Sequence, residues 1–110
     1  FLAVKGLAKI IEVVNKIKAT TNRAVEISGV FVTMFDKRRI LHKDVLDTII
    51  MYFDDRVFST KVRSNIALAE APTLGQDIFE YDQASNGAFD YARIVLEVIE
   101  MEKKYSINNE

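Results

Sequence analysis

The chain has 110 residues, of which 49% are hydrophobic and 28% charged, a composition that predicts one globular core and excludes disorder, collagen and low-complexity repeats. It contains no cysteine and a single histidine, His42, which excludes disulfide frameworks, zinc ribbons and multi-histidine metal sites. The net charge of −1, with no apolar run long enough to span a bilayer and no signal peptide, predicts a cytoplasmic protein that binds neither membranes nor nucleic acid through its overall charge.

The first half of the chain predicts a helix, a strand and a second helix. Apolar residues recur at helical spacing over residues 3–18, with lysines and a glutamate on the opposite side. Residues 25–35 form a nearly continuous β-branched and apolar run, which is typical of a strand covered on both faces in a parallel sheet. Helical spacing returns from about Leu41 to Phe53. These three elements predict a layered α/β arrangement.

The second half predicts a short strand and two helices. Residues 57–62 read as a strand, parallel to the first because a helix-bearing connection separates them. Residues 64–71 read as a short helix, capped by Ser64 or Asn65 and stopped by Pro72. A long helix follows Ser85 and ends near residues 103–104, before a loose tail at 106–110. Its predicted buried face consists of Ala88, Tyr91, Ala92, Val95, Val98 and Ile99.

The predicted fold class is α/β, with a parallel sheet and helices that cover a βαβ core. Only two strands are evident, so residues 1–110 read as a single incomplete α/β unit whose sheet edges lack partners. Unpaired backbone groups at such edges favour association with a second copy of the chain. We therefore expect a homodimer, formed by edge-to-edge strand addition or by exchange of a helix.

Several motifs follow one another along the chain. Residues 29–36 read GVFVTMFD, residues 68–78 read LAEAPTLGQDI, residues 81–82 read YD, and residues 85–88 read SNGA. In this order and spacing they resemble the C-terminal half of ParA-type partition ATPases (ParA/Soj/MinD-like proteins with a deviant Walker P-loop). The resemblance extends over about residues 6–102 and is more specific than any one short motif.

The resemblance implies the C-terminal part of a doubly wound parallel sheet of the P-loop NTPase type. It also implies ATP and magnesium as cofactors of the full-length protein, ATP-dependent dimerisation, nonspecific DNA binding on the nucleoid, and a centromere-binding partner protein that stimulates hydrolysis. A P-loop needs two glycines five positions apart before a lysine, and the only glycines here are at positions 6, 29, 75 and 87. We therefore expect no ATP hydrolysis by this chain alone.

The resemblance also assigns an adenine-binding side. Thr33 and Met34, with Asp36 at the end of the same strand, would border the base, and Ser64 and Asn65 would close its other side. The alternative for the chain alone is that Met34 belongs to the core and that Asp36 caps the next turn.

A basic cluster follows the first strand. Lys37, Arg38, Arg39 and Lys43 have no acidic residue among them, and together they could contact DNA phosphates. By resemblance, Arg38 stands where the family places an arginine, and Arg63 is a substitute for two family arginines that this sequence lacks. The alternative is that the cluster is a solvated loop at a helix start.

Two functions follow from these observations. In the first, the chain is the C-terminal fragment of a ParA-type ATPase that partitions plasmid, chromosome or mobile-element DNA. In the alternative, it is a non-catalytic ParA-like interaction or regulatory module. A Lys-Gly-Gly-x-Gly-Lys-Thr-like segment immediately upstream would distinguish the two.

Overall fold

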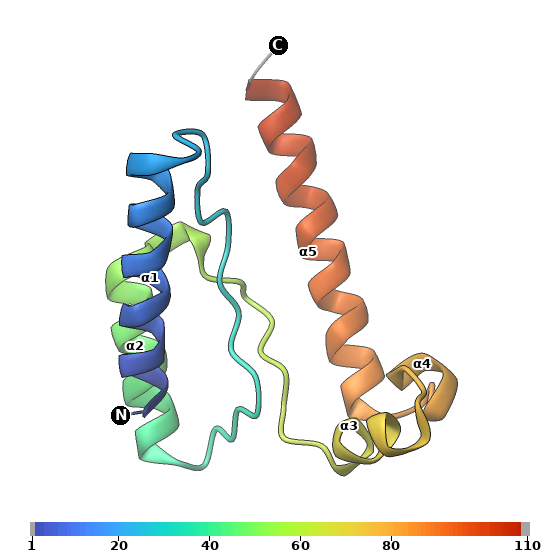
Figure 1. Ribbon diagram of the computed structural model, residues 1–110. Helices are drawn as coiled ribbons and strands as arrows, with labels where there is room; N and C mark the ends of the chain where they lie inside the picture. The colour runs from blue at the N-terminus through green and yellow to red at the C-terminus, as the bar shows by residue number, and fades with distance from the viewer. Residues whose placement is uncertain (1, 109–110) are drawn as a thin grey trace. The chain divides into compact units, whose positions relative to one another are not determined.

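The structure is a computed structural model that describes residues 2–108, with side chains described from residue 5 to residue 104. The chain divides into two compact units, each assembled from two separate stretches of sequence (Figure 1). Of the described residues, the first unit holds 2–30 and 37–57, and the second holds 31–36 and 58–108. Each of the two segments predicted as strands therefore contributes to both units.

The first unit consists of two helices, the turn after the second helix and an extended segment. Its elements are α1 (Leu2–Thr20), α2 (Ile40–Phe53) and the 3-10 turn η1 (Asp54–Arg56). Ile49 and Phe53 are buried, and the Arg56 guanidinium lies 5.1 Å from the centroid of the Phe53 ring. Both helices predicted for this half of the chain are confirmed.

The second unit packs short helices near the start of a long one (Figure 1). Its elements are α3 (Ile66–Glu70), the 3-10 turn η2 (Ala71–Leu74), α4 (Ile78–Tyr81) and α5 (Asn86–Asn108). One buried cluster contains Phe58, Val62 and Ile94, and another contains Ala67, Ile78 and Ala88. Leu68 packs against both clusters, so α3 connects the extended segment to α5.

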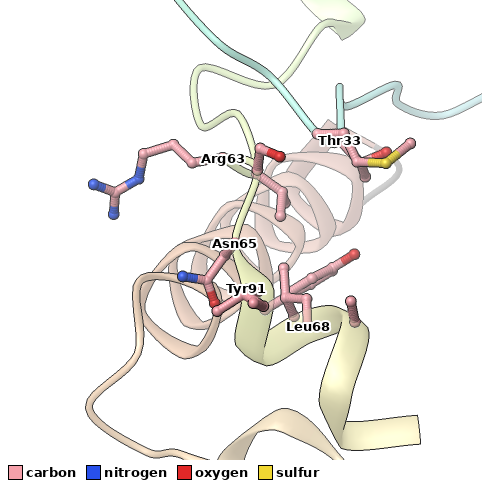
Figure 2. Close-up of a pocket in the computed structure, with 10 residues that line it drawn as sticks. Thr33, Arg63, Asn65, Leu68 and Tyr91 are labelled. Carbon is pink, nitrogen blue, oxygen red and sulfur yellow. The ribbon is translucent and has the colours of Figure 1, made fainter. Parts of the chain in front are cut away.

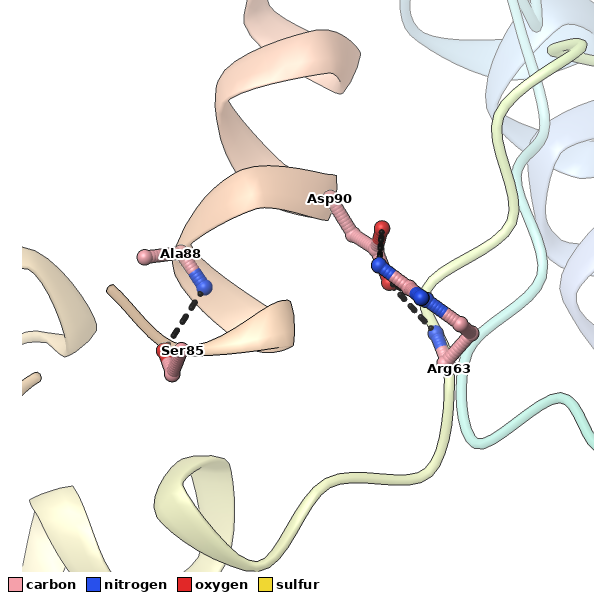
Figure 3. Close-up of polar contacts among 4 residues, drawn as sticks. All are labelled: Arg63, Ser85, Ala88 and Asp90. Carbon is pink, nitrogen blue, oxygen red and sulfur yellow. Dashed lines mark hydrogen bonds and ion pairs between the residues drawn. The ribbon is translucent and has the colours of Figure 1, made fainter. Parts of the chain in front are cut away.

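The turns of the second unit use the chemistry that the sequence indicates. Gly75 ends η2 with φ 65°, a left-handed conformation that glycine adopts without a Cβ clash. The Ser85 Oγ accepts a hydrogen bond from the Ala88 N–H at 3.0 Å, which caps α5 as predicted (Figure 3). Asp77 caps α4 in the same way, through a 2.9 Å bond from the Glu80 N–H.

The predicted α/β class is wrong: the described residues form no doubly wound parallel sheet and no βαβ core. They contain helices and two isolated bridges, Val30–Val57 in the first unit and Phe35–Arg63 in the second. Both bridges are parallel, as predicted, but the pairing register shifts by one residue between them. The expected strands at 25–35 and 57–62 are therefore extended segments without a continuous ladder.

Pairing stays short for three physical reasons. Parallel pairs are less stable per residue than antiparallel ones, and two strands without further neighbours are marginal in water. Side chains of α5 also bond to the second segment: the Glu97 carboxylate accepts from the N–H groups of Ser59 and Thr60 at 2.8 and 3.0 Å. The Asp90 carboxylate accepts from the Arg63 N–H at 2.9 Å. These donors are therefore unavailable to another strand.

Only the first part of the predicted buried face of α5 is confirmed. Ala88 is buried and Tyr91 packs against the core, as predicted. Further along, Val95, Val98 and Ile99 are each at least 39% exposed, and Ile94, which was not predicted, is buried instead. The helix also runs further than expected, because the tail predicted to be loose at 106–110 is helical as far as residue 108. Residues 109–110 lie outside the described part of the chain. No helix in that part is both long and apolar enough to cross a membrane.

Candidate functional site

The second unit contains a cavity of about 590 Å³ (Figure 2). Its walls come from both extended segments, from α3 and from α5. The lining residues are Thr33, Met34, Val62, Arg63, Ser64, Asn65, Ile66, Leu68, Ala69 and Tyr91. Thr33, Met34, Ser64 and Asn65, which were singled out from the sequence, thus line one cavity. The fifth, Asp36, is half-buried and does not line this cavity.

Backbone hydrogen bonds hold the two extended walls together. The Val62 N–H donates to the Val32 carbonyl at 2.8 Å, and the Phe35 N–H donates to the Val62 carbonyl at 3.0 Å. The Ser64 N–H donates to the Phe35 carbonyl at 3.3 Å. The residues that line the cavity lie within or directly after these bonded stretches, so this pairing sets the width of the cavity.

Met34 has an unusual backbone conformation at the cavity. Its φ of 52° lies in the left-handed region, which costs a residue with a Cβ roughly 1–2 kcal/mol. The residue is nevertheless 71% exposed, so the alternative prediction that Met34 belongs to the core is wrong. A polarisable thioether exposed in this way can contact the flat face of an aromatic ligand.

Asn65 lines the cavity and carries an unsatisfied polar atom. It occupies the N-cap position of α3, as predicted, but its side chain makes no capping hydrogen bond. Its Oδ1 atom is buried and has no hydrogen-bond partner among the described residues. Leaving such an acceptor unpaired costs about 1–3 kcal/mol. Asn65 therefore contributes to the cavity wall while its carboxamide oxygen is enclosed by the protein.

Arg63 forms an ion pair with Asp90 of α5. Its guanidinium extends away from the other labelled lining residues (Figure 2). Its Nε donates to Asp90 Oδ2 at 3.0 Å and its Nη2 donates to Oδ1 at 2.9 Å (Figure 3). Burial alone would raise the pKa of Asp90, but the hydrogen bonds and charge of Arg63 hold that pKa below its usual value. The same pairing raises the pKa of Arg63.

Two carboxylates that organise this unit, Asp90 and Glu97, were not predicted from the sequence. Hydrogen bonds from Ser59 and Thr60 lower the pKa of Glu97 despite its partial burial. A signal for both acids was present, because they stand seven residues apart and share a helix face with Ile94. Acidic residues on a face that is otherwise apolar indicate buried hydrogen-bonding partners.

The residues predicted to bind DNA divide between the two units. Arg38, Arg39 and Lys43 are exposed at the start of α2 in the first unit, whereas Arg63 belongs to the second. Their contact with phosphates stays a prediction. Within the described residues, no group of three or more His, Asp or Glu side chains could hold a metal ion.

Comparison with known proteins gives consistent matches, although no family profile matches the sequence. The chain is 34% identical over 99 residues to the chromosome-partitioning ATPase Soj of Treponema pallidum. It is 35% identical over 98 residues to the sporulation initiation inhibitor protein Soj of Bacillus subtilis, and 30% identical over 103 residues to the chromosome partitioning protein ParA of Caulobacter vibrioides. These matches cover 90%, 89% and 94% of the chain, which spans 39% of the length of each relative.

Proposed function

Because the chain belongs to the ParA/Soj family of chromosome-partitioning proteins, we propose that its cavity is the base-binding side of an ATP site in a DNA-partitioning ATPase. The family predicted from the motifs is confirmed by these relatives, and a match to 39% of their length is consistent with a C-terminal fragment. ATP hydrolysis, DNA binding and partner recognition are accordingly proposals about the whole protein.

The observation that carries this proposal is that Thr33, Met34, Ser64 and Asn65, which come from two distant segments, line one cavity. Adenine has a flat face that can lie against an exposed thioether such as that of Met34. Apolar lining residues, among them Val62 and Leu68, suit the rest of the ring. These features support adenine as the ligand.

The residues of this chain fit the base and not the phosphates or magnesium. None of the glycines at positions 6, 29, 75 and 87 stands in a P-loop pattern. The described residues also provide no cluster of carboxylates for a cation. We therefore assign this chain no step in phosphoryl transfer. ATP and magnesium are proposed as cofactors of the whole protein only.

We further propose that the whole protein acts in the cytoplasm, associated with the nucleoid. The exposed basic side chains of Arg38, Arg39 and Lys43 support nonspecific contact with DNA phosphates. A homodimer and a centromere-binding partner protein are proposed from family membership. Strand addition at residues 59–63 is disfavoured for this dimer, because Asp90 and Glu97 already accept N–H groups there.

A titration with adenosine tests the base site without needing phosphates. We expect millimolar binding, followed by NMR, to shift the backbone amides of Thr33, Met34, Ser64 and Asn65. Asn65→Asp keeps an acceptor oxygen and should bind adenosine, whereas Asn65→Leu should weaken binding about tenfold. Asn15→Leu, on the exposed side of α1, is the matched control. Shifts that map elsewhere, or equal binding by Asn65→Leu, would refute the base site.

A further inference from the structure

We infer that Arg63 and Asp90 are a positioning pair that holds both extended walls of the cavity against α5. This inference rests on the proposed function of the cavity as a base site. It assigns Arg63 a role different from the phosphate contact predicted from the sequence. Neither residue touches the base in this assignment, and both act through the segment that carries Ser64 and Asn65.

One carboxylate receives three hydrogen bonds from the same residue. Two come from the Arg63 guanidinium and one from its backbone N–H, all at 2.9–3.0 Å. The Asp90 side chain is 5% exposed and the Arg63 side chain 48% exposed, so the carboxylate end of these bonds is shielded from water. The bond to the backbone N–H is important because it fixes the main chain of Arg63 as well as its side chain.

The main chain of Arg63 is connected directly to the cavity walls. Arg63 is bridged to Phe35, and its neighbour Ser64 donates to the Phe35 carbonyl at 3.3 Å. Displacement of Arg63 would therefore move Ser64 and Asn65 on one wall and the stretch that precedes Phe35 on the other. On α5, Asp90 is followed by Tyr91, which lines the same cavity. The pair thus connects three walls of the site.

The side-chain chemistry favours arginine at this position. The planar guanidinium presents two parallel N–H groups to the carboxylate, which fixes the angle as well as the distance between partners. A lysine would keep the charge but would lose this two-point geometry. A positioning role needs the two parallel N–H groups of arginine, whereas a phosphate contact needs only a positive charge. Substitution of Arg63 by lysine therefore distinguishes the two roles.

Three single variants of the 110-residue chain test the inference: Asp90→Asn, Arg63→Lys and, as the matched control, Glu97→Gln. Glu97 lies on the same face of α5 and also bonds to the second segment, but at Ser59 and Thr60, which do not line the cavity. Amide hydrogen exchange at Ser64 and Asn65 is measured by NMR, together with adenosine binding and the free energy of unfolding.

We expect Asp90→Asn and Arg63→Lys to speed exchange at Ser64 and Asn65 about tenfold and to weaken adenosine binding by a similar factor. Glu97→Gln should lower the free energy of unfolding but leave exchange and binding at the cavity unchanged. The positioning role is overturned if Asp90→Asn leaves exchange at the wild-type rate, or if Glu97→Gln speeds it equally. If Arg63→Lys shows wild-type exchange and adenosine binding, the two parallel N–H groups of arginine are not needed.

The two proposals fail in different ways. If the wild-type chain does not bind adenosine, the base site is refuted, while the exchange rates at Ser64 and Asn65 still decide the positioning role. The other case is that the wild-type chain binds adenosine, and that Asp90→Asn binds it equally well with unchanged exchange rates. The base site is then supported, and the positioning role of Arg63 and Asp90 is refuted.

Discussion

The buried Asp90 carboxylate should make the second unit sensitive to acid. Its pKa is held below the ordinary value of 3.8, because the bonds from Arg63 outweigh the effect of burial. A depressed folded-state pKa stabilises the fold above the unfolded pKa, and this contribution is lost as the pH falls through the folded value. We therefore expect the free energy of unfolding, measured in urea, to decrease below about pH 4.

Asp90→Asn should reduce this acid dependence, because an amide does not titrate. Glu100→Gln is the control, since Glu100 is exposed on the same helix. An Asp90→Asn chain that loses stability with acid as steeply as the wild type would contradict the assignment.

Gly87 is a second residue on which the packing depends. A Cβ built at this position would lie 2.5 Å from Leu68 Cγ and 2.8 Å from Leu68 Cδ2. We expect Gly87→Ala to lower the free energy of unfolding by about 1–3 kcal/mol, because the Leu68 side chain must move from its packed position. Leu68→Ala should lower it by about 2–5 kcal/mol by leaving a cavity. In urea titrations the double variant should lose less than the sum of the two, and strict additivity would argue against the clash.

At the scale of single residues, the sequence predicted only part of the site. The motifs indicated Thr33, Met34, Ser64 and Asn65, and the structure places these at one cavity. Spacing indicated that Asp90 shares a helix face with Ile94, but it could not predict that Arg63 is its partner, because this depends on which face of α5 meets a segment 27 residues earlier. Hydrophobic periodicity gives the existence of a helix but not the angle at which its face packs.

At the scale of elements, the start of α5 depends on Ser85. Its Oγ accepts from the Ala88 N–H and donates to the Asp82 carbonyl at 2.7 Å, and the residue is 9% exposed. Ser85→Ala should therefore lower the free energy of unfolding by about 1 kcal/mol, with a matching loss of helicity by circular dichroism. Ser59→Ala is the control and should change stability by less than about 0.5 kcal/mol, because the exposed Ser59 bonds through its backbone. Equal losses in both variants would contradict the cap.

Helices were predicted well and the sheet was not, for a physical reason. A helix forms its backbone hydrogen bonds within a short stretch of sequence. The helical spacing of apolar residues at 3–18 and 41–53 was therefore enough to predict α1 and α2. A strand needs partners on its edges, and the apolar run at 25–35 finds them only at two bridges within the described residues. The apolar composition of that run indicated that the segment could be buried, but not that it would pair with another strand.

At the scale of the whole molecule, DNA binding should depend on where the positive charges lie. We expect the chain to be retained weakly on DNA-cellulose at low salt, and Arg38→Ala with Arg39→Ala to reduce the slope of log K against log salt by about 2. The control removes two other exposed charges, Lys103 and Lys104 of α5, by substitution with alanine. Equal weakening by both double variants would show that net charge, not the cluster before α2, governs retention.

The bonds from Asp90 and Glu97 to the second extended segment also affect how the chain folds during its synthesis. The bonded residues are separated by 27, 37 and 38 positions, so the segment leaves the ribosome well before its partners do. At a synthesis rate of about 5–20 residues per second, these carboxylates are made roughly one to eight seconds after the N–H groups of Ser59, Thr60 and Arg63. During this interval they can pair with a neighbouring nascent chain on the same messenger RNA. We therefore expect slower translation through α5 to lengthen the time during which the segment can aggregate.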